Sequence, residues 1–229
     1  MESPATDSLP PITDLAIFPV IYYTSYTTPF SAARFSQLLA EIPERFREKT
    51  GRFRRWQDAH ADLLGKHLLL HAFKAHNCKA TLNDIAYTKY GRPFVADTPD
   101  FNISHSGEMV VCSISPIGRI GIDIEQNAPI AVADFRNQFS PEEWRNIEQA
   151  NPQEPIFYKY WTIKEAILKA DGRGIFQSLD TLHVADSNTI PLDDQQWHIT
   201  AIGHFEKYIC HIATDIPHQQ YILRKVSFA

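Results

Sequence analysis

The sequence predicts an α+β fold, in which runs of helix and runs of strand form separate layers. Three observations lead to this prediction. Helical and strand-like patterns come in runs that do not alternate strictly, and in each half of the chain, after an initial strand-like part, helical patterns precede further strand-like ones. The 229 residues are 44% apolar, which is enough to bury a sizeable core in one domain or two.

The first half combines two helical patterns with two strand-like ones. They are a strand at Ala16–Thr24, helices at Ser31–Ile42 and Phe53–Ala75, and a strand at Ile85–Tyr90. Asn77 is expected to end the longer helix, since asparagine is common just after a helix. Gly91-Arg92-Pro93 is typical of a turn after the second strand.

The second half begins with a predicted hairpin, in which Val110–Ser115 pairs with Arg119–Glu125 around the turn Pro116-Ile117-Gly118. Ser140 is expected to cap a helix running to Ala150, because Pro141 and Glu143 follow it at the positions typical of a helix start. The remaining predicted elements are a helix from Pro155 to Asp171 ended by Gly172, and strands at Thr181–Ala185, Trp197–Ile202, Tyr208–Thr214 and Tyr221–Val226.

Two acidic residues alternate with isoleucines in Gly121-Ile122-Asp123-Ile124-Glu125. On a strand, this alternation buries the isoleucines and projects Asp123 and Glu125 from the other face. Taken alone, such a pair also suits an ordinary solvated face.

Glu165 and Lys169 lie four residues apart on the predicted helix, so that they are one turn apart on the same face. An exposed Glu–Lys pair of this kind adds only about 0.2–0.5 kcal/mol and needs no ligand. Together with Asp123 and Glu125, however, the pair gives three carboxylates beside an ammonium group. Carboxylates without Cys or His neighbours favour a hard cation such as Mg²⁺, which takes remaining ligands from substrate phosphates.

A third segment, Phe101-Asn102-Ile103-Ser104-His105-Ser106-Gly107, leads into the acidic strand. Two further motifs follow it: Ile120–Glu125, and Trp161-x-x-Lys-Glu-x-x-x-Lys169 with Gly-x-Gly after it. Together the three motifs resemble those of the 4′-phosphopantetheinyl transferases of the surfactin-synthetase-activating (Sfp-like) type. The resemblance covers about residues 42–180, including Asp58-Ala59-His60 and the turn at Gly91.

The resemblance implies two similar α/β halves related by a pseudo-twofold axis, with the active site in the cleft between them. Residues 1–112 would form the N-terminal half, on the side of the adenosine and 3′-phosphate of coenzyme A. Residues 113–229 would form the C-terminal half, with Mg²⁺ and the catalytic residues.

The implied reaction transfers the 4′-phosphopantetheine group of coenzyme A to a serine of an acyl or peptidyl carrier protein and releases adenosine 3′,5′-bisphosphate. Attack on a pyrophosphate needs charge neutralisation, alignment and a base. Asp123 and Glu125 are assigned as ligands of Mg²⁺, and Mn²⁺ can take the place of this ion. Glu165 is assigned as either a third ligand or the general base. Lys169 is assigned to the pyrophosphate.

The resemblance also implies residues that bind coenzyme A. Ser104 and His105 would contact its phosphates, and Lys49 and Arg52 would bind the 3′-phosphate. Arg92 would also bind coenzyme A; it occupies the position of the lysine in the Gly-Lys-Pro that is usual in the family.

One departure from the family lies close to these predicted contacts. Ala61-Asp62 follows His60 where Arg-Thr or Arg-Ser is common. A cation is therefore replaced by an anion, which the neighbouring Arg54 or Arg55 could offset.

Composition is compatible with this function. A net charge of −5 argues against broad nucleic-acid binding. The three cysteines, Cys78, Cys112 and Cys210, have neither zinc spacing nor a disulfide pattern, which favours reduced thiols in the cytoplasm. No signal or membrane anchor is predicted, and we expect a monomer. Two alternatives remain at this point: a coenzyme A-binding module without catalysis, and a Mg²⁺-dependent phosphohydrolase.

Overall fold

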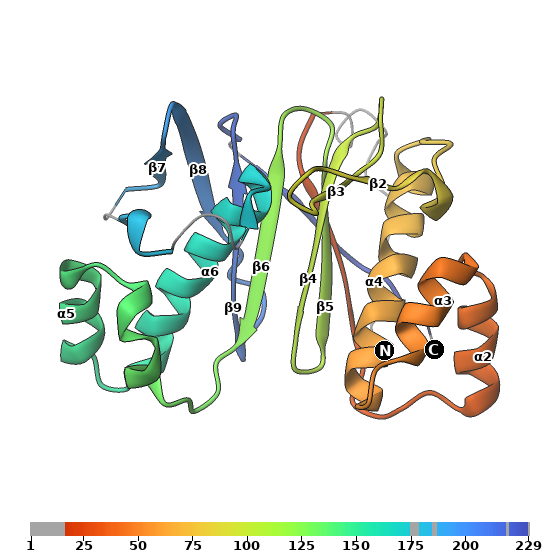
Figure 1. Cartoon of the computed structure of the whole chain (residues 1–229), viewed down its shortest axis with the longest axis horizontal. Helices are drawn as coiled ribbons and strands as arrows, with labels where there is room; N and C mark the ends of the chain where they lie inside the picture. Colours follow the sequence, from red (N-terminus) through yellow and green to blue (C-terminus); the bar gives the residue numbers. More distant parts are fainter. Residues whose placement is uncertain (1–16, 175–178, 185–186, 219, 229) are drawn as a thin grey trace, which may run out of the picture.

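Two four-stranded sheets, each covered by a long helix, make up the computed structural model of the chain (Figure 1). The structure describes residues 17–174, 179–184, 187–218 and 220–228. The first sheet has the strand order β10-β1-β5-β4, and the second has the order β6-β9-β8-β7. A mixed helix-and-sheet architecture confirms the predicted α+β class.

The first sheet packs against the helix α4 (Trp56–Ala75), with α2 (Ala32–Ala40) and α3 (Glu44–Gly51) outside it (Figure 1). Its strands are β1 (Val20–Ser25), β4 (Asp100–Ser106), β5 (Met109–Ser115) and β10 (Ile222–Lys225). A short two-stranded sheet, β2 (Ala86–Tyr87) with β3 (Pro93–Phe94), follows the 3₁₀ helix η1 (Leu82–Asp84). The helix predicted at residues 53–75 therefore forms, whereas α3 before it was not predicted.

The second sheet packs against the helix α6 (Glu154–Asp171), with α5 (Pro141–Gln149) outside it (Figure 1). Its strands are β6 (Ile120–Gln126), β7 (Thr189–Leu192), β8 (Gln195–Ala201) and β9 (Tyr208–Thr214). Ser140 caps α5 in a capping box with Glu143, and Gly172 ends α6 in the left-handed conformation, as the sequence predicted.

Three apolar clusters form the core. One lies between α4 and the first sheet, and a second lies between α6, α5 and the second sheet. The third joins the two sheets, because Ile21 and Val111 of the first meet Ile122, Ile124 and Ile212 of the second. The two isoleucines of the acidic segment are thus fully buried, and the opposite face of β6 turns towards α6.

The predicted hairpin between residues 110–115 and 119–125 is wrong, although both strands exist. β5 pairs with β1 and β4, whereas β6 pairs with β9. The turn between β5 and β6 passes from one sheet to the other, and there Gly118 lies against Asp215 and Ile216. Turn residues indicate where the chain changes direction, but the pairing depends on contacts distant in sequence.

The strand predicted at 181–185 is also wrong over its described residues. The 3₁₀ helix η4 (Leu179–Thr181) occupies its start, and residues 182–184 form no strand. β7, a few residues further on, was missed.

The predicted division between residues 112 and 113 lies inside β5. In terms of sheets, the first ends with β5 at Ser115, and the second begins with β6 at Ile120. β10 then returns to the first sheet, where it pairs parallel to β1. No helix among the described residues is long and apolar enough to cross a membrane.

Candidate active site

A cavity of about 370 Å³ lies where β4, β6 and α6 meet. β4 contributes Ile103, Ser104 and His105, β6 contributes Asp123 and Glu125, and α6 contributes Trp161, Glu165 and Lys169. The structure therefore brings together the four residues of the predicted Mg²⁺–phosphate site and two of the residues predicted to bind coenzyme A.

Asp123 is the most buried acidic group of this cavity, with only 3% of its surface exposed. Its Oδ1 accepts hydrogen bonds from Lys169 Nζ at 2.5 Å and from Ser104 Oγ at 3.0 Å. Its Oδ2 is buried and has no hydrogen-bond partner among the described residues. A buried carboxylate oxygen without a partner is costly, so this atom has the position and chemistry of a ligand to a cation.

Glu125 and Glu165 share one electrostatic environment. Burial raises the pKa of both carboxyl groups, and the negative charge of Asp123 raises them further, whereas Lys169 acts in the opposite direction. A hydrogen bond from Ser106 also lowers the pKa of Glu125. Three carboxylates with one ammonium group leave an excess of negative charge, which a divalent cation would neutralise.

The donor set fits such a cation in kind, because oxygen ligands without Cys or His suit Mg²⁺ or Mn²⁺. Among the described residues, no three His, Cys, Asp or Glu side chains already lie close enough together to hold a metal ion. The Lys169 ammonium group occupies Asp123 Oδ1 instead. Holding a metal would therefore require side chains of the cavity to rearrange, with the Lys169 ammonium group leaving Asp123 Oδ1.

Gly121 explains why β6 and α6 can place their charged residues together. A Cβ atom on Gly121 would lie 2.0 Å from the Ala166 carbonyl oxygen and 2.5 Å from the Ala170 nitrogen. Only glycine allows this approach of strand and helix backbones. Asp123 and Glu125 follow Gly121 at alternate positions on the same face of the strand, and they therefore face α6 as well.

The cavity residues of α6 follow the helical repeat. Trp161, Glu165 and Lys169 lie four residues apart and form one face of the helix. Lys164 lies on another face, where its Nζ is buried and donates to Glu143 Oε2 at 2.7 Å. The two lysines of the motif thus have different surroundings, and only Lys169 is at the cavity.

β4 and β6 are joined by side chains rather than by backbone pairing, since they belong to different sheets. Alternate β4 side chains accept hydrogen bonds from alternate β6 amides, and we call this set the side-chain ladder. Its four pairs are Asp100 with Ile120 at 2.8 Å, Asn102 with Ile122 at 3.0 Å, Ser104 with Ile124 at 3.4 Å and Ser106 with Gln126 at 3.1 Å. The ladder holds β4 and β6, the two strands that line the cavity, against each other.

His105 lies on the opposite face of β4 from the ladder, at the rim of the cavity. Desolvation in the cleft lowers its pKa, as does repulsion from Lys169, whereas Asp58, Asp62 and Asp123 act in the opposite direction. A lowered pKa favours the neutral imidazole near neutral pH, so His105 offers hydrogen bonding more than charge.

Three predicted coenzyme A residues do not line this cavity. Lys49 lies 3.7 Å from Asp62, and Arg52 lies 3.8 Å from Glu48; both cationic side chains are largely exposed. Their predicted contacts with the 3′-phosphate stay predictions.

Arg92 is only 10% exposed and its guanidinium group is engaged within the protein. It forms a two-pronged ion pair with Asp100 at 2.9 and 2.6 Å. It also donates to the carbonyl oxygens of Ile120 and Lys169, at the start of β6 and the end of α6. These contacts tie β4, β6 and α6 together. The predicted contact of Arg92 with coenzyme A stays a prediction; its hydrogen bonds to the described residues use four of the five N–H donors and leave one on Nη1.

The departure at Ala61-Asp62 has a structural explanation. Ala61 is buried, and the Asp62 carboxylate accepts from Lys66 Nζ and Thr50 Oγ1, each at 2.5 Å. The extra anion is therefore neutralised by a lysine one turn further along α4, and the helix is connected to α3 through Thr50.

Three contributors to the site were not predicted from the sequence. Ser106 donates to Glu125 Oε2 at 2.7 Å, and Ile103 and Trp161 line the cavity. A signal for Ser106 was present, since Asp100, Asn102, Ser104 and Ser106 are polar at every second position of one strand.

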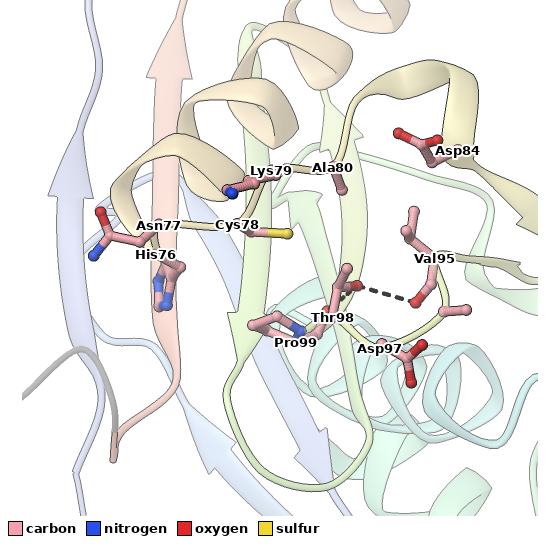
Figure 2. Close-up of a pocket in the computed structure, with 11 residues that line it drawn as sticks. His76, Asn77, Cys78, Lys79, Ala80, Asp84, Val95, Asp97, Thr98 and Pro99 are labelled. Atoms are coloured by element: carbon pink, nitrogen blue, oxygen red, sulfur yellow. Dashed lines mark hydrogen bonds between the residues drawn. The ribbon is translucent and has the colours of Figure 1, made fainter.

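A second cavity, of about 730 Å³, lies between the end of α4 and the loop before β4 (Figure 2). His76, Cys78, Asp84, Asp97 and Thr98 are among its lining residues. Its side chains combine small apolar, acidic, basic and hydroxyl groups without a concentration of one charge. None of the predicted site residues lines it.

Comparisons with known proteins show which family the chain belongs to. Residues 28–116 match the family model described as 4′-phosphopantetheinyl transferase, N-terminal, and residues 119–216 match that of the 4′-phosphopantetheinyl transferase superfamily. A 4′-phosphopantetheinyl transferase of Bacillus subtilis is 34% identical over 169 residues, covering 72% of this chain and 75% of that protein. The transferase Sfp of B. subtilis strain 168 is 34% identical over 170 residues, with the same coverage.

Another relative matches a shorter part of the chain. The L-aminoadipate-semialdehyde dehydrogenase-phosphopantetheinyl transferase of Schizosaccharomyces pombe is 35% identical over 134 residues, or 49% of this chain and 50% of that protein. The two family models together match almost the whole described chain and divide at the turn between β5 and β6. This chain belongs to the 4′-phosphopantetheinyl transferase family.

Proposed function

We propose that this chain transfers the 4′-phosphopantetheine group of coenzyme A to a serine hydroxyl of an acyl or peptidyl carrier protein. Membership of the transferase family supports this proposal. The structural observation that carries it is the buried Asp123 Oδ2, which has no partner among the described residues and lies beside Lys169, Glu125 and Glu165.

Asp123, Glu125 and Glu165 would hold a Mg²⁺ ion, with Mn²⁺ as a substitute. When bound, the ion would neutralise charge on the pyrophosphate oxygens as the phosphorus–oxygen bond changes. The three carboxylates provide oxygen ligands only, in a partly desolvated cavity where electrostatic interactions are strengthened.

Lys169 is proposed to bind the pyrophosphate. Its Nζ already lies in the cavity, donating to Asp123 Oδ1 and Ser104 Oγ, so a small movement would direct it to a phosphate oxygen. Glu165 is proposed to accept the proton of the carrier serine or to serve as the third metal ligand. The serine oxygen then forms a bond to the phosphorus, and adenosine 3′,5′-bisphosphate leaves with the electrons of the broken bond.

The remaining contacts with coenzyme A are proposed on the basis of resemblance. Ser104 and His105 line the cavity and are within reach of a phosphate there. Lys49 and Arg52 are exposed cations on α3 and its C-terminal end, and would bind the 3′-phosphate. We also propose that the protein acts as a monomer in the cytoplasm, an environment in which its three described cysteines, all free, stay reduced.

Mass spectrometry of an apo carrier protein incubated with this protein, coenzyme A and Mg²⁺ tests the proposed reaction. We expect a phosphopantetheine adduct on one serine of the carrier. Free 4′-phosphopantetheine without an adduct would instead indicate a phosphohydrolase. Neither product, with coenzyme A still bound, would indicate a binding module.

Metal removal gives the first testable prediction. Chelation with EDTA should abolish detectable adduct formation, and added Mg²⁺ or Mn²⁺ should restore it, because three carboxylates and a pyrophosphate repel one another without a cation. The control is addition of EDTA already saturated with Mg²⁺. Undiminished turnover in metal-free buffer would contradict the metal assignment.

A further inference from the structure

Two pairs of the side-chain ladder differ from the others. Asp100 and Asn102 accept hydrogen bonds from β6 amides through carboxylate and amide oxygens. Ser104 and Ser106 accept through hydroxyl oxygens, and a hydroxyl group also has a proton to donate. In both cases that proton goes to a carboxylate of the cavity.

The contacts of the two serines repeat along β6. Ser104 Oγ donates to Asp123 Oδ1 at 3.0 Å and accepts from the amide of the next residue, Ile124. Ser106 Oγ donates to Glu125 Oε2 at 2.7 Å and accepts from the amide of the next residue, Gln126. Each serine therefore contacts one acidic residue of the cavity and the backbone directly after it.

The Gln126 amide determines how the Ser106 hydroxyl is oriented. The backbone N–H can only donate, so the hydroxyl oxygen must present a lone pair to it at 3.1 Å. The single hydroxyl proton is then available for Glu125. A hydrogen bond to a charged carboxylate is stronger than one between neutral groups.

The end of β4 lies close to side chains of β6 and β9. Gly107 follows it with φ +54°, and a Cβ atom there would lie 2.5 Å from Gln126 Oε1 and 3.0 Å from Tyr208 Oη. The Tyr208 hydroxyl also accepts from the amide of Glu108 at 3.1 Å. These contacts place the turn beside the side chains of Gln126 on β6 and Tyr208 on β9, next to the hydrogen bond between Ser106 and Glu125.

We propose that Ser106 is a positioning residue of the transferase, whose hydroxyl orients the Glu125 carboxylate for metal binding. Glu125 has a flexible side chain, and one hydrogen bond to Oε2 from a fixed hydroxyl reduces the number of orientations it samples. The inference rests on the proposed function and adds to it a residue that belongs to the first sheet but acts on an acid of the second.

The matched variants Ser106→Thr and Ser106→Val test this role. Threonine and valine have nearly the same shape and both suit strands, but only threonine has the hydroxyl. Binding of Mn²⁺ in the presence of coenzyme A, measured by electron paramagnetic resonance, reports on the carboxylates without requiring transfer. Carrier modification and thermal unfolding are measured on the same proteins.

We expect Ser106→Val to bind Mn²⁺ about 10–100-fold more weakly than Ser106→Thr and to transfer more slowly by a similar factor, the range for losing a partner of a metal ligand. The two unfolding temperatures should stay close together. Equal Mn²⁺ affinity in the two variants would overturn the proposal, and so would a difference fully explained by a lower unfolding temperature of the valine variant.

Two further measurements, on Ser106→Ala and on the unaltered protein, complete the test. If neither branched side chain is accommodated, Ser106→Ala against the unaltered protein gives the same measurement, with the same expected loss of Mn²⁺ affinity. Failure of the proposed function is recognised separately, because the unaltered protein would then form no carrier adduct. The positioning role is overturned when loss of the hydroxyl leaves Mn²⁺ binding unchanged, or when the weaker binding is fully explained by a lower unfolding temperature.

Discussion

The two halves of the molecule pack a long helix on a four-stranded sheet, but they differ in how closely the two backbones approach. In the first half the close contact is at Gly65 of α4, where a Cβ atom would lie 3.0 Å from a methyl carbon of Ile103. In the second half it is at Gly121 of β6, where a Cβ atom would lie 2.0 Å from a backbone oxygen. The tighter packing occurs where acidic side chains must be placed together.

Buried lysines show the same difference. Lys66 pairs with Asp62 on its own helix. Lys164 instead reaches from α6 to Glu143 of α5 and to the carbonyl oxygens of Gln138 and Leu179. The second half is therefore cross-linked around α6, and this fixes the helix that carries Glu165. The first half supplies hydroxyl groups to the cavity, and the second supplies carboxylates.

The largest expected effect is on stability. Lys164 and Glu143 are 1% and 2% exposed. Lys164→Met therefore leaves the buried Glu143 carboxylate without its cationic partner, with only the amides of Ser140 and Val184 as donors, and should lower the free energy of unfolding by about 3–5 kcal/mol. Lys66→Met is the control, because Asp62 keeps Thr50 and Lys49 as partners. Denaturant unfolding measures both variants. An equal loss of unfolding free energy in the two variants would contradict the difference between the halves, because the two lysines would then stabilise their halves equally.

The next effect is on activity. Asp123→Asn keeps the shape of the side chain but removes its charge, and should lower the rate of carrier modification by on the order of 10²-fold or more, as expected for one preorganised electrostatic group. Asp134→Asn, at an exposed position of η2 (Val132–Gln138), is the control and should change little. Similar rates for the two variants would exclude Asp123 from the chemistry.

A smaller effect tests the helix–strand approach itself. Gly121→Ala must push β6 and α6 apart, which should cost about 1–3 kcal/mol of unfolding free energy and also slow transfer, since Asp123 and Lys169 would separate. Gly65→Ala meets a side chain that can move, and should cost less. Thermal unfolding together with the transfer assay compares them. A greater loss at Gly65 would reverse the comparison between the halves.

Local signals in the sequence predicted much of the fold. Ser140 and Gly172 marked helix ends correctly because capping depends on a few neighbouring residues. The partner of β6 could not be predicted, because Pro116-Ile117-Gly118 specifies a turn and not a pairing. The partner, β9, lies some ninety residues away in the sequence, and only packing across the sheet selects it.

The residues of the site were also predicted where local sequence patterns indicate them, and missed where their role depends on contacts distant in sequence. Periodicity put Asp123 with Glu125 and Glu165 with Lys169, and the resemblance brought the two pairs together; the cavity contains all four. Arg92 showed only its charge in the sequence, so its ion pair with Asp100 was not foreseen. The role of Ser106 also depends on two strands that share no backbone pairing.

The central claim is that hydroxyl groups of the first sheet hold carboxylates of the second. A double-mutant cycle with Ser106→Ala, Glu125→Ala and the double variant tests it most directly, through the free energy of unfolding in metal-free buffer. The hydrogen bond of 2.7 Å predicts that the two changes are coupled by at least about 1 kcal/mol, the removal of Ser106 costing less once Glu125 is absent. Additivity within about 0.5 kcal/mol would contradict the claim.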